Sequence, residues 1–169
     1  MKYLRYFNMI SVLWLALVSF SQSAGAQTDD KNARKPAIKQ MIDSHNFVFV
    51  AQSVTPLRGR FRNLTSEYDV KVAGDTMVSY LPYFGRAYSA PLNPSEAGLN
   101  FTSTNFSYTV TPHKKNGWDV VIKPKDNSDI QQFRFTIYDN GSANLNVTNI
   151  SRDPISFNGA IKEEKKKKE

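Results

Sequence analysis

Apolar and polar residues alternate with a period of two along most of this chain, and short polar turns separate the alternating runs. The runs cover residues 47–51, 68–72, 77–81, 106–110, 118–122, 133–137, 143–147 and 155–161. Successive side chains of a strand point to opposite faces, so each run predicts a strand with one packed and one wet face. Parallel crossovers need about a dozen residues or more, and most of these connections are shorter. The pattern predicts an antiparallel meander of about eight strands.

One segment before the first strand has a helical period instead. Ile38, Met41, Ile42 and His45 recur at the i, i+3, i+4 and i+7 spacing of a helix face. We therefore expect one amphipathic helix over about residues 34–44, with its apolar stripe packed on the sheet. The predicted fold class is mainly β (α+β), a coiled sheet or open barrel with one N-terminal helix.

The beginning of the chain has the form of a secretory signal peptide. Lys2 and Arg5 precede a nearly unbroken apolar run over residues 9–20, and Ala24-Gly25-Ala26 matches the site that signal peptidase cleaves. We predict cleavage between Ala26 and Gln27. The apolar run is about half of the roughly 20 residues that span a bilayer, so no transmembrane segment is expected after cleavage.

The chain contains no cysteine, which excludes disulfides, thiolate metal ligands and a lipid-anchored lipoprotein. A cysteine-free exported chain fits a bacterial periplasm, since small eukaryotic secreted domains usually carry disulfides. The predicted organisation is a signal peptide at 1–26, a flexible leader at 27–33, one β-rich domain at 34–161 and a charged disordered tail at 162–169.

The net charge argues against nucleic acid as a partner. The formal charge of +7 falls to +5 when Lys2 and Arg5 leave with the signal peptide, and the tail supplies +2 of that. The remaining body is only mildly basic, which favours solubility and weak attraction to anionic surfaces.

A ten-residue segment is the most distinctive part of the sequence. Residues 79–88, here called the hallmark segment, read Ser-Tyr-Leu-Pro-Tyr-Phe-Gly-Arg-Ala-Tyr, and this segment resembles exported bacterial proteins catalogued as domain of unknown function 4251. The resemblance extends to Gly98-Leu99-Asn100-Phe101, Asn116-Gly117-Trp118, Asn140-Gly141-Ser142-Ala143 and residues 155–161. It implies a shared fold and an address in the cell envelope, and it implies no activity.

The hallmark segment is also the first candidate site. Tyr80, Tyr83, Phe84 and Tyr88 surround one cation, Arg86. Aromatic faces around a guanidinium can bind a sugar or an anionic group. The alternative is a structural role, in which the rings close one end of the sheet and Arg86 pairs with a carboxylate such as Asp75 or Glu96.

A second candidate is a row of alternating arginines. Arg58, Arg60 and Arg62 would project from one face of an extended backbone and could bind phosphates or an acidic glycan. The alternative is an edge strand that uses charge to prevent self-pairing.

The sequence carries no recognised catalytic motif, and its two histidines lack a metal-ligand spacing, so no catalytic residue, metal or cofactor is assigned. We expect a non-enzymatic periplasmic protein that binds a small ligand, a glycan or an envelope partner on a sheet face. The alternatives are a hydrolase acting on envelope glycans and a structural partner in outer-membrane assembly.

Overall fold

The computed structural model describes residues 26–88 and 98–164, with side chains from residue 34 onward. The chain divides into two compact units, residues 1–33 and residues 34–169, and the second unit holds the folded domain. The predicted signal peptide before Ala26 and the last five residues of the predicted tail lie outside the described residues.

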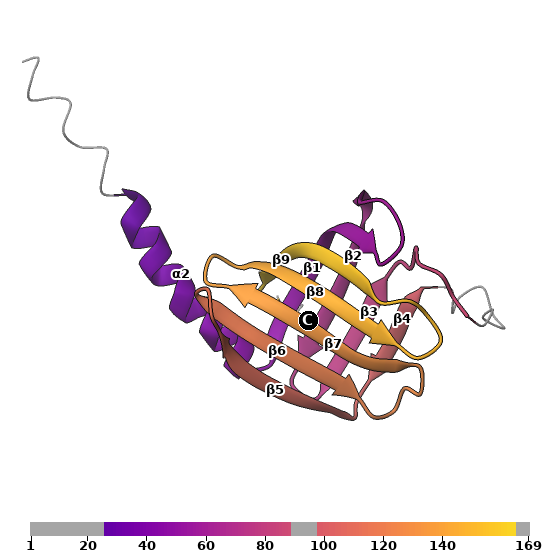
Figure 1. The fold of residues 1–169 in the computed structure, drawn as a ribbon. Helices are drawn as coiled ribbons and strands as arrows, with labels where there is room; N and C mark the ends of the chain where they lie inside the picture. The colour runs from indigo at the N-terminus through magenta and orange to yellow at the C-terminus, as the bar shows by residue number, and fades with distance from the viewer. Residues whose placement is uncertain (1–25, 89–97, 165–169) are drawn as a thin grey trace, which may run out of the picture. The chain divides into compact units, whose positions relative to one another are not determined.

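Nine strands form one antiparallel sheet in the order β4-β3-β2-β1-β9-β8-β7-β6-β5 (Figure 1). The strands are β1 (Asn46–Pro56), β2 (Arg62–Ala73), β3 (Thr76–Leu81), β4 (Leu99–Ser103), β5 (Phe106–His113), β6 (Gly117–Pro124), β7 (Ile130–Tyr138), β8 (Ser142–Asn149) and β9 (Ile155–Lys162). The predicted antiparallel sheet is confirmed. The strand absent from the prediction is β4, a five-residue edge strand.

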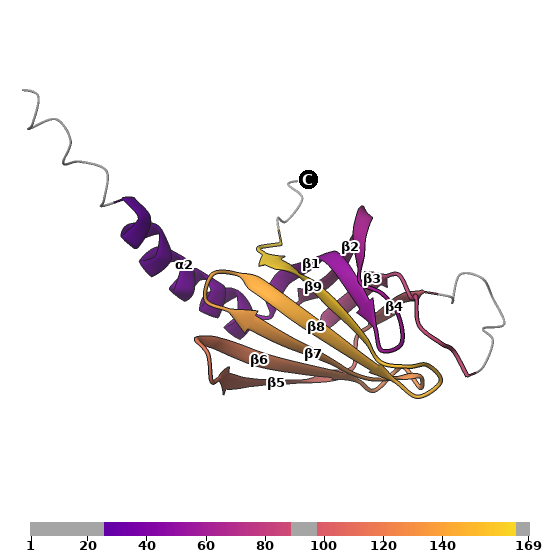
Figure 2. The same cartoon turned by 45° about the horizontal axis from the view of Figure 1, so that its top comes forward.

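The sheet curls into a half-barrel. Strands β5 to β8 pass across β1 to β4, and a turned view shows the same curvature (Figures 1 and 2). The two edge strands, β4 and β5, are consecutive in the chain and only Thr104 and Asn105 separate them. The Asp126 carboxylate accepts hydrogen bonds from the Ser103 hydroxyl at 2.6 Å and from the Thr104 N–H at 2.9 Å. The turn between the two edge strands is therefore held to the connection between β6 and β7.

Large apolar side chains fill the concave face of the sheet. Its fully buried aromatic residues are Phe47, Phe49, Phe133, Phe135 and Phe157. The Phe135 ring centroid lies 5.8 Å from that of Phe47 and 5.7 Å from that of Phe49, both edge-on. The described interior is thus a packed core and not an open cup.

The helix α2 (Ala26–Asp43) contributes the end of its apolar stripe to this core. Ile38 and Ile42 are buried, and the Tyr108 hydroxyl donates a 2.9 Å hydrogen bond to the Ile42 carbonyl. The helix begins eight residues before the predicted start at Arg34 and ends one residue before the predicted end. His45 follows it with a φ of 51°, and its ring lies 3.8 Å from that of Tyr108.

The first and last strands pair along the middle of the sheet. Val50 faces Ala160 and Ala51 faces Gly159 in the β1–β9 register, which shifts at a bulge between Ala51 and Ser53. A Cβ on Gly159 would overlap the Val50 carbonyl oxygen, so glycine is required for this close approach.

Candidate binding surface

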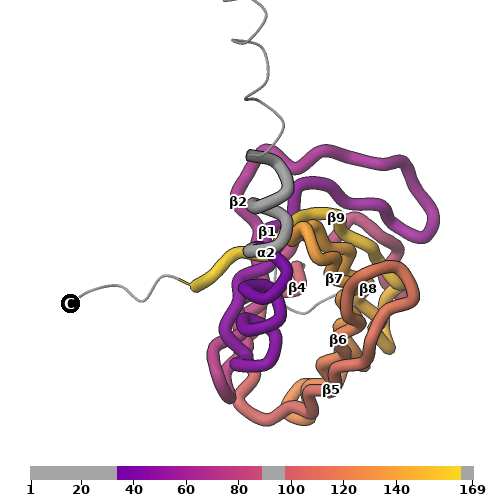
Figure 3. Tube along the Cα trace, turned by 90° about the vertical axis from the view of Figure 1, so that its left-hand side faces the viewer, coloured from indigo at the N-terminus to yellow at the C-terminus, as the bar shows by residue number. Residues whose placement is uncertain are grey.

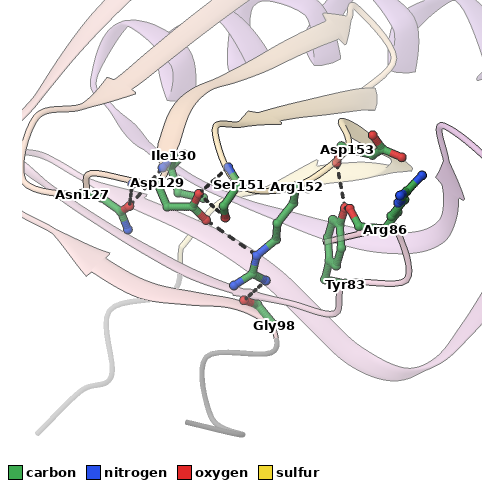
Figure 4. Close-up of polar contacts among 9 residues, drawn as sticks. All are labelled: Tyr83, Arg86, Gly98, Asn127, Asp129, Ile130, Ser151, Arg152 and Asp153. Carbon is green, nitrogen blue, oxygen red and sulfur yellow. Dashed lines mark hydrogen bonds and ion pairs between the residues drawn. The ribbon is translucent and has the colours of Figure 1, made fainter. Parts of the chain in front are cut away.

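The hallmark segment leaves the sheet at the end of β3 and folds back on itself. The Tyr83 hydroxyl lies 2.9 Å from the carbonyl oxygens of both Arg86 and Asp153 and can donate to either (Figure 4). Gly85 leaves room for this ring, since a Cβ at that position would collide with the Tyr83 hydroxyl. Tyr83 therefore fixes the shape of the loop from inside.

The segment before β9 holds the other side of the loop. The Asp153 N–H donates to the Arg86 carbonyl at 2.9 Å, and the Tyr88 N–H donates to the Ser151 carbonyl at 2.8 Å. The Tyr88 hydroxyl also donates to the buried Asp153 carboxylate. An isolated antiparallel bridge between Ala87 and Arg152 completes the contact. Residues more than 60 positions apart thus hold the hallmark segment in place.

Arg152, and not Arg86, is the arginine that makes a structural ion pair. Its Nε lies 3.6 Å from an Asp129 carboxylate oxygen, and another guanidinium nitrogen donates to the Gly98 carbonyl at 3.1 Å (Figure 4). Its guanidinium also lies 5.3 Å from the centre of the Tyr83 ring. Nothing in the sequence singles out Arg152, because its role depends on chain segments that meet only in the fold.

Arg86 is exposed and makes no ion pair with any residue that the structure describes. The suggested partner Asp75 lies in the β2–β3 turn, and Glu96 falls outside the described ranges. Within the described ranges Arg86 therefore does not pair with Asp75, and its pairing with Glu96 lies outside the described residues. Tyr83 and Tyr88, by contrast, make structural hydrogen bonds to Asp153.

The two tyrosines of the loop are held in their neutral form. Burial raises the pKa of Tyr83, and the nearby Asp153 charge adds to that effect. The hydrogen bond to Asp153 is the main cause that raises the pKa of Tyr88. Both hydroxyls consequently act as hydrogen-bond donors to this loop and not as bases.

The three alternating arginines lie in and after the connection from β1 to β2, not along one strand. Arg58 is in a turn, Arg60 is in irregular backbone and Arg62 is the first residue of β2, and all three are exposed. The Arg62 guanidinium lies 5.1 Å from the centre of the Phe84 ring. Arg58 and Arg86 both act electrostatically on the Tyr88 hydroxyl. The two candidate sites, separate in sequence, thus form one surface.

This surface also carries several exposed large apolar side chains. Among the residues that the structure describes, its exposed large apolar side chains are Leu57, Phe61, Phe84 and Tyr88. Leu57 is anchored through its N–H, which donates to the Pro154 carbonyl at 3.3 Å. We call these four residues, with Arg58, Arg60, Arg62 and Arg86, the arginine–aromatic surface. Tyr80 has no ring contact with the described residues of this surface. Its ring instead stacks on that of Tyr68, with centroids 5.7 Å apart.

The acidic residues near this end of the sheet are engaged in structural contacts. Asp129 accepts hydrogen bonds from the Ser151 N–H and hydroxyl at 2.9 and 2.6 Å. The hydrogen bond from Ser103 is the main cause that lowers the pKa of Asp126.

Within the described ranges, no group of three or more His, Cys, Asp or Glu residues could hold a metal ion. In the same part of the chain, no helix has the length and apolar character to cross a membrane.

These features define a class of small, mainly β domain, with an open curled sheet, a filled interior and loops tied across one end. The chain belongs to the family described as domain of unknown function (DUF4251), whose model matches residues 29–161. This confirms the resemblance that the hallmark segment indicated.

A solved structure shares the fold. It is the crystal structure of a DUF4251 family protein from Bacteroides eggerthii DSM 20697, with a TM-score of 0.56 and 13% sequence identity. The match covers 78% of this chain and 88% of that chain. At this identity the likeness concerns the fold alone. None of the curated proteins compared with the chain matches it.

Proposed function

We propose that this protein is exported to the periplasm and acts by binding, not by catalysis, through the arginine–aromatic surface. The observation that carries the proposal is the contact between Arg62 and Phe84, which joins the arginine row to the hallmark segment. Two groups of residues suited to binding, from separate parts of the chain, converge in one exposed place.

The packing of the rest of the domain supports this location. The concave face is filled by buried residues such as Phe47 and Phe135, which favours a loop surface over this face of the sheet as the binding surface. Exposed arginines without an ion-pair partner contribute little to stability, so the four arginines of this surface are not needed for the fold. Their position beside exposed rings supports binding to a partner.

The chemistry of the surface indicates an anionic partner. Guanidinium groups bind phosphate and carboxylate in a bidentate manner, and exposed rings add apolar contact or sugar stacking. Glycan hydrolysis has less support, because Asp126 and Asp129 are already hydrogen-bonded by neighbouring main-chain and hydroxyl groups.

The test is retention on an immobilised polyanion, heparin. The probed protein lacks residues 1–26, which leaves the compact unit of residues 34–169 whole. We expect salt-sensitive retention that is lost when Arg58, Arg60, Arg62 and Arg86 are all replaced by Gln. The matched control replaces four exposed lysines elsewhere, Lys35, Lys114, Lys115 and Lys123, by Gln and should elute close to the unmodified protein. Equal losses in both variants would show that only net charge matters and would refute a specific surface.

The export part of the proposal has its own test. Protein recovered from the periplasm should begin at Gln27 when its N-terminus is sequenced, because the Ala24-Gly25-Ala26 site precedes it. Recovery of protein with an intact Met1 in the cytoplasm would contradict export without affecting the heparin result.

A further inference from the structure

We propose that the partner of the arginine–aromatic surface is an anionic lipid bilayer, bound through lipid phosphates and the partial insertion of apolar side chains. This inference rests on the proposed binding function and specifies the class of partner. It is carried by the order of residues in the β1–β2 connection, by the shape of that region and by its charge.

The β1–β2 connection places apolar residues on either side of cations. It reads Leu57-Arg58-Gly59-Arg60-Phe61, with Leu57 62% exposed and Phe61 57% exposed. An exposed leucine is of little use for binding a sugar, whose recognition relies on hydrogen bonds and ring faces. Apolar residues flanked by arginines match the boundary between acyl chains and charged headgroups, where arginine can remain near phosphate while neighbouring side chains insert.

A further exposed apolar residue borders this region. Ile150 is 61% exposed and directly precedes Ser151, the residue that binds the Tyr88 main chain. Leu57 and Tyr88 are both hydrogen-bonded to residues 151–154, so the apolar side chains of both loops are anchored on one short segment. Fixed loops of this kind can present apolar groups to a membrane without first becoming ordered, which lowers the entropic cost of binding.

The shape of the region favours a bilayer over a small ligand. The β1–β2 connection protrudes from the curled sheet (Figure 3). Two hollows of the domain are not lined by any residue of the arginine–aromatic surface. One, of about 1150 Å³, lies over β1 and β2 and is lined by residues such as Val48 and Lys71. The other, of about 360 Å³, is lined by residues such as Asn100 and Asn127. A protruding surface suits a flat partner, whereas a small ligand is usually bound in a hollow.

The charge of the surface is complementary to anionic headgroups. Arg58, Arg60, Arg62 and Arg86 are all exposed, and none of them pairs with a carboxylate in the described part of the chain. A basic side chain near an anionic membrane strengthens binding roughly fivefold. Membrane binding strengthens with buried apolar area and with attraction to anionic lipids, and this surface offers both.

The experiment is cosedimentation of the protein lacking residues 1–26 with vesicles. One set of vesicles contains phosphatidylglycerol and phosphatidylethanolamine, and the other contains only phosphatidylcholine. We expect binding to the first set and at least about a tenfold weaker partition coefficient for the second. The double variant Leu57→Ser, Phe61→Ser should bind the anionic vesicles about tenfold or more weakly while its retention on heparin is unchanged.

The matched control is the double variant Val78→Ser, Tyr80→Ser, which removes exposed apolar side chains from β3 and should bind the vesicles like the unmodified protein. Melting curves establish that each variant is folded. Arginine-dependent retention on heparin without vesicle binding would overturn the membrane inference and leave the proposed function intact, with a soluble glycan or protein as partner. Vesicle binding that is insensitive to Leu57 and Phe61 would overturn the insertion. Failure on both heparin and vesicles would overturn the proposed function itself.

Discussion

The core of the curled sheet and the arginine–aromatic surface use the same kinds of residue in opposite ways. Phe133 and Phe135 are fully buried and stack with centroids 6.4 Å apart, whereas Phe84 is 40% exposed and contacts an arginine. The core aromatics occupy alternate positions within strands, and Phe61 and Phe84 lie outside any strand. The position of an aromatic residue relative to the strand pattern, and not its type, separates residues that support the fold from residues available for a partner.

The largest expected effect contrasts one phenylalanine from each region. Phe135→Ala should lower the free energy of unfolding by about 3–5 kcal/mol, because it removes a ring that contacts Phe47, Phe49 and Phe133. Phe84→Ala should change it by less than about 1 kcal/mol, since the ring is already exposed. Denaturant unfolding of both variants measures the difference. Similar losses in the two variants would mean that the hallmark loop is part of the core.

A smaller effect is expected for two arginines, of which Arg86 belongs to the arginine–aromatic surface and Arg152 lies outside it. Arg152→Met should lower the free energy of unfolding by about 1–3 kcal/mol, because it leaves Asp129 and the Gly98 carbonyl without this partner. Arg86→Met should change it by no more than about 0.5 kcal/mol. Thermal melting of the two variants tests the assignment of one arginine to structure and the other to binding. A large loss for Arg86→Met would reverse it.

The smallest expected effect concerns the alkaline side of the pH range. The hydrogen bond to Asp153 raises the pKa of Tyr88 above 10.0, so the folded state retains a proton that the unfolded state releases first. The stabilisation is therefore fully present below pH 10.0 and is lost as the pH rises through the folded pKa. We expect the difference in unfolding free energy between the protein and Tyr88→Phe to be constant below pH 10.0 and to shrink as the pH rises above it. A difference that stays constant above pH 10.0 as well would show that Tyr88 does not interact with Asp153 in solution.

The fold was largely predictable because most strands carry a local alternation of apolar and polar residues. The alternating residues 118–122 and 133–137 lie in β6 and β7, as predicted. Ile38 and Ile42 of the predicted helix are buried in the core, also as predicted. The strand β4 was missed because it is short and lies at an edge, where Leu99 is its one buried apolar residue. An edge strand needs fewer apolar positions and so leaves a weaker pattern.

The candidate site was predictable in its parts and not in its assembly. Aromatic residues and Arg86 stood out in sequence, but nothing local connected them with Arg62 or with Asp153. Asp153 is 3% exposed although it lies between two strands, in a position that resembles an ordinary polar turn. Such a residue is buried by contacts between segments distant in sequence. A single sequence does not show which of its segments make such contacts.

The pairing of β1 with β9 has a consequence for the order of folding. Each half of the sheet, β1 to β4 and β5 to β9, is built from strands that pair with their neighbours in the chain, but the halves join through the first and last strands. A chain that emerges from a ribosome or a translocation pore with its N-terminus first cannot form this pairing until residues 155–162 have emerged. Until then the outer edge of β1 has no strand beside it, so the domain remains incompletely folded for as long as its C-terminal strand is withheld.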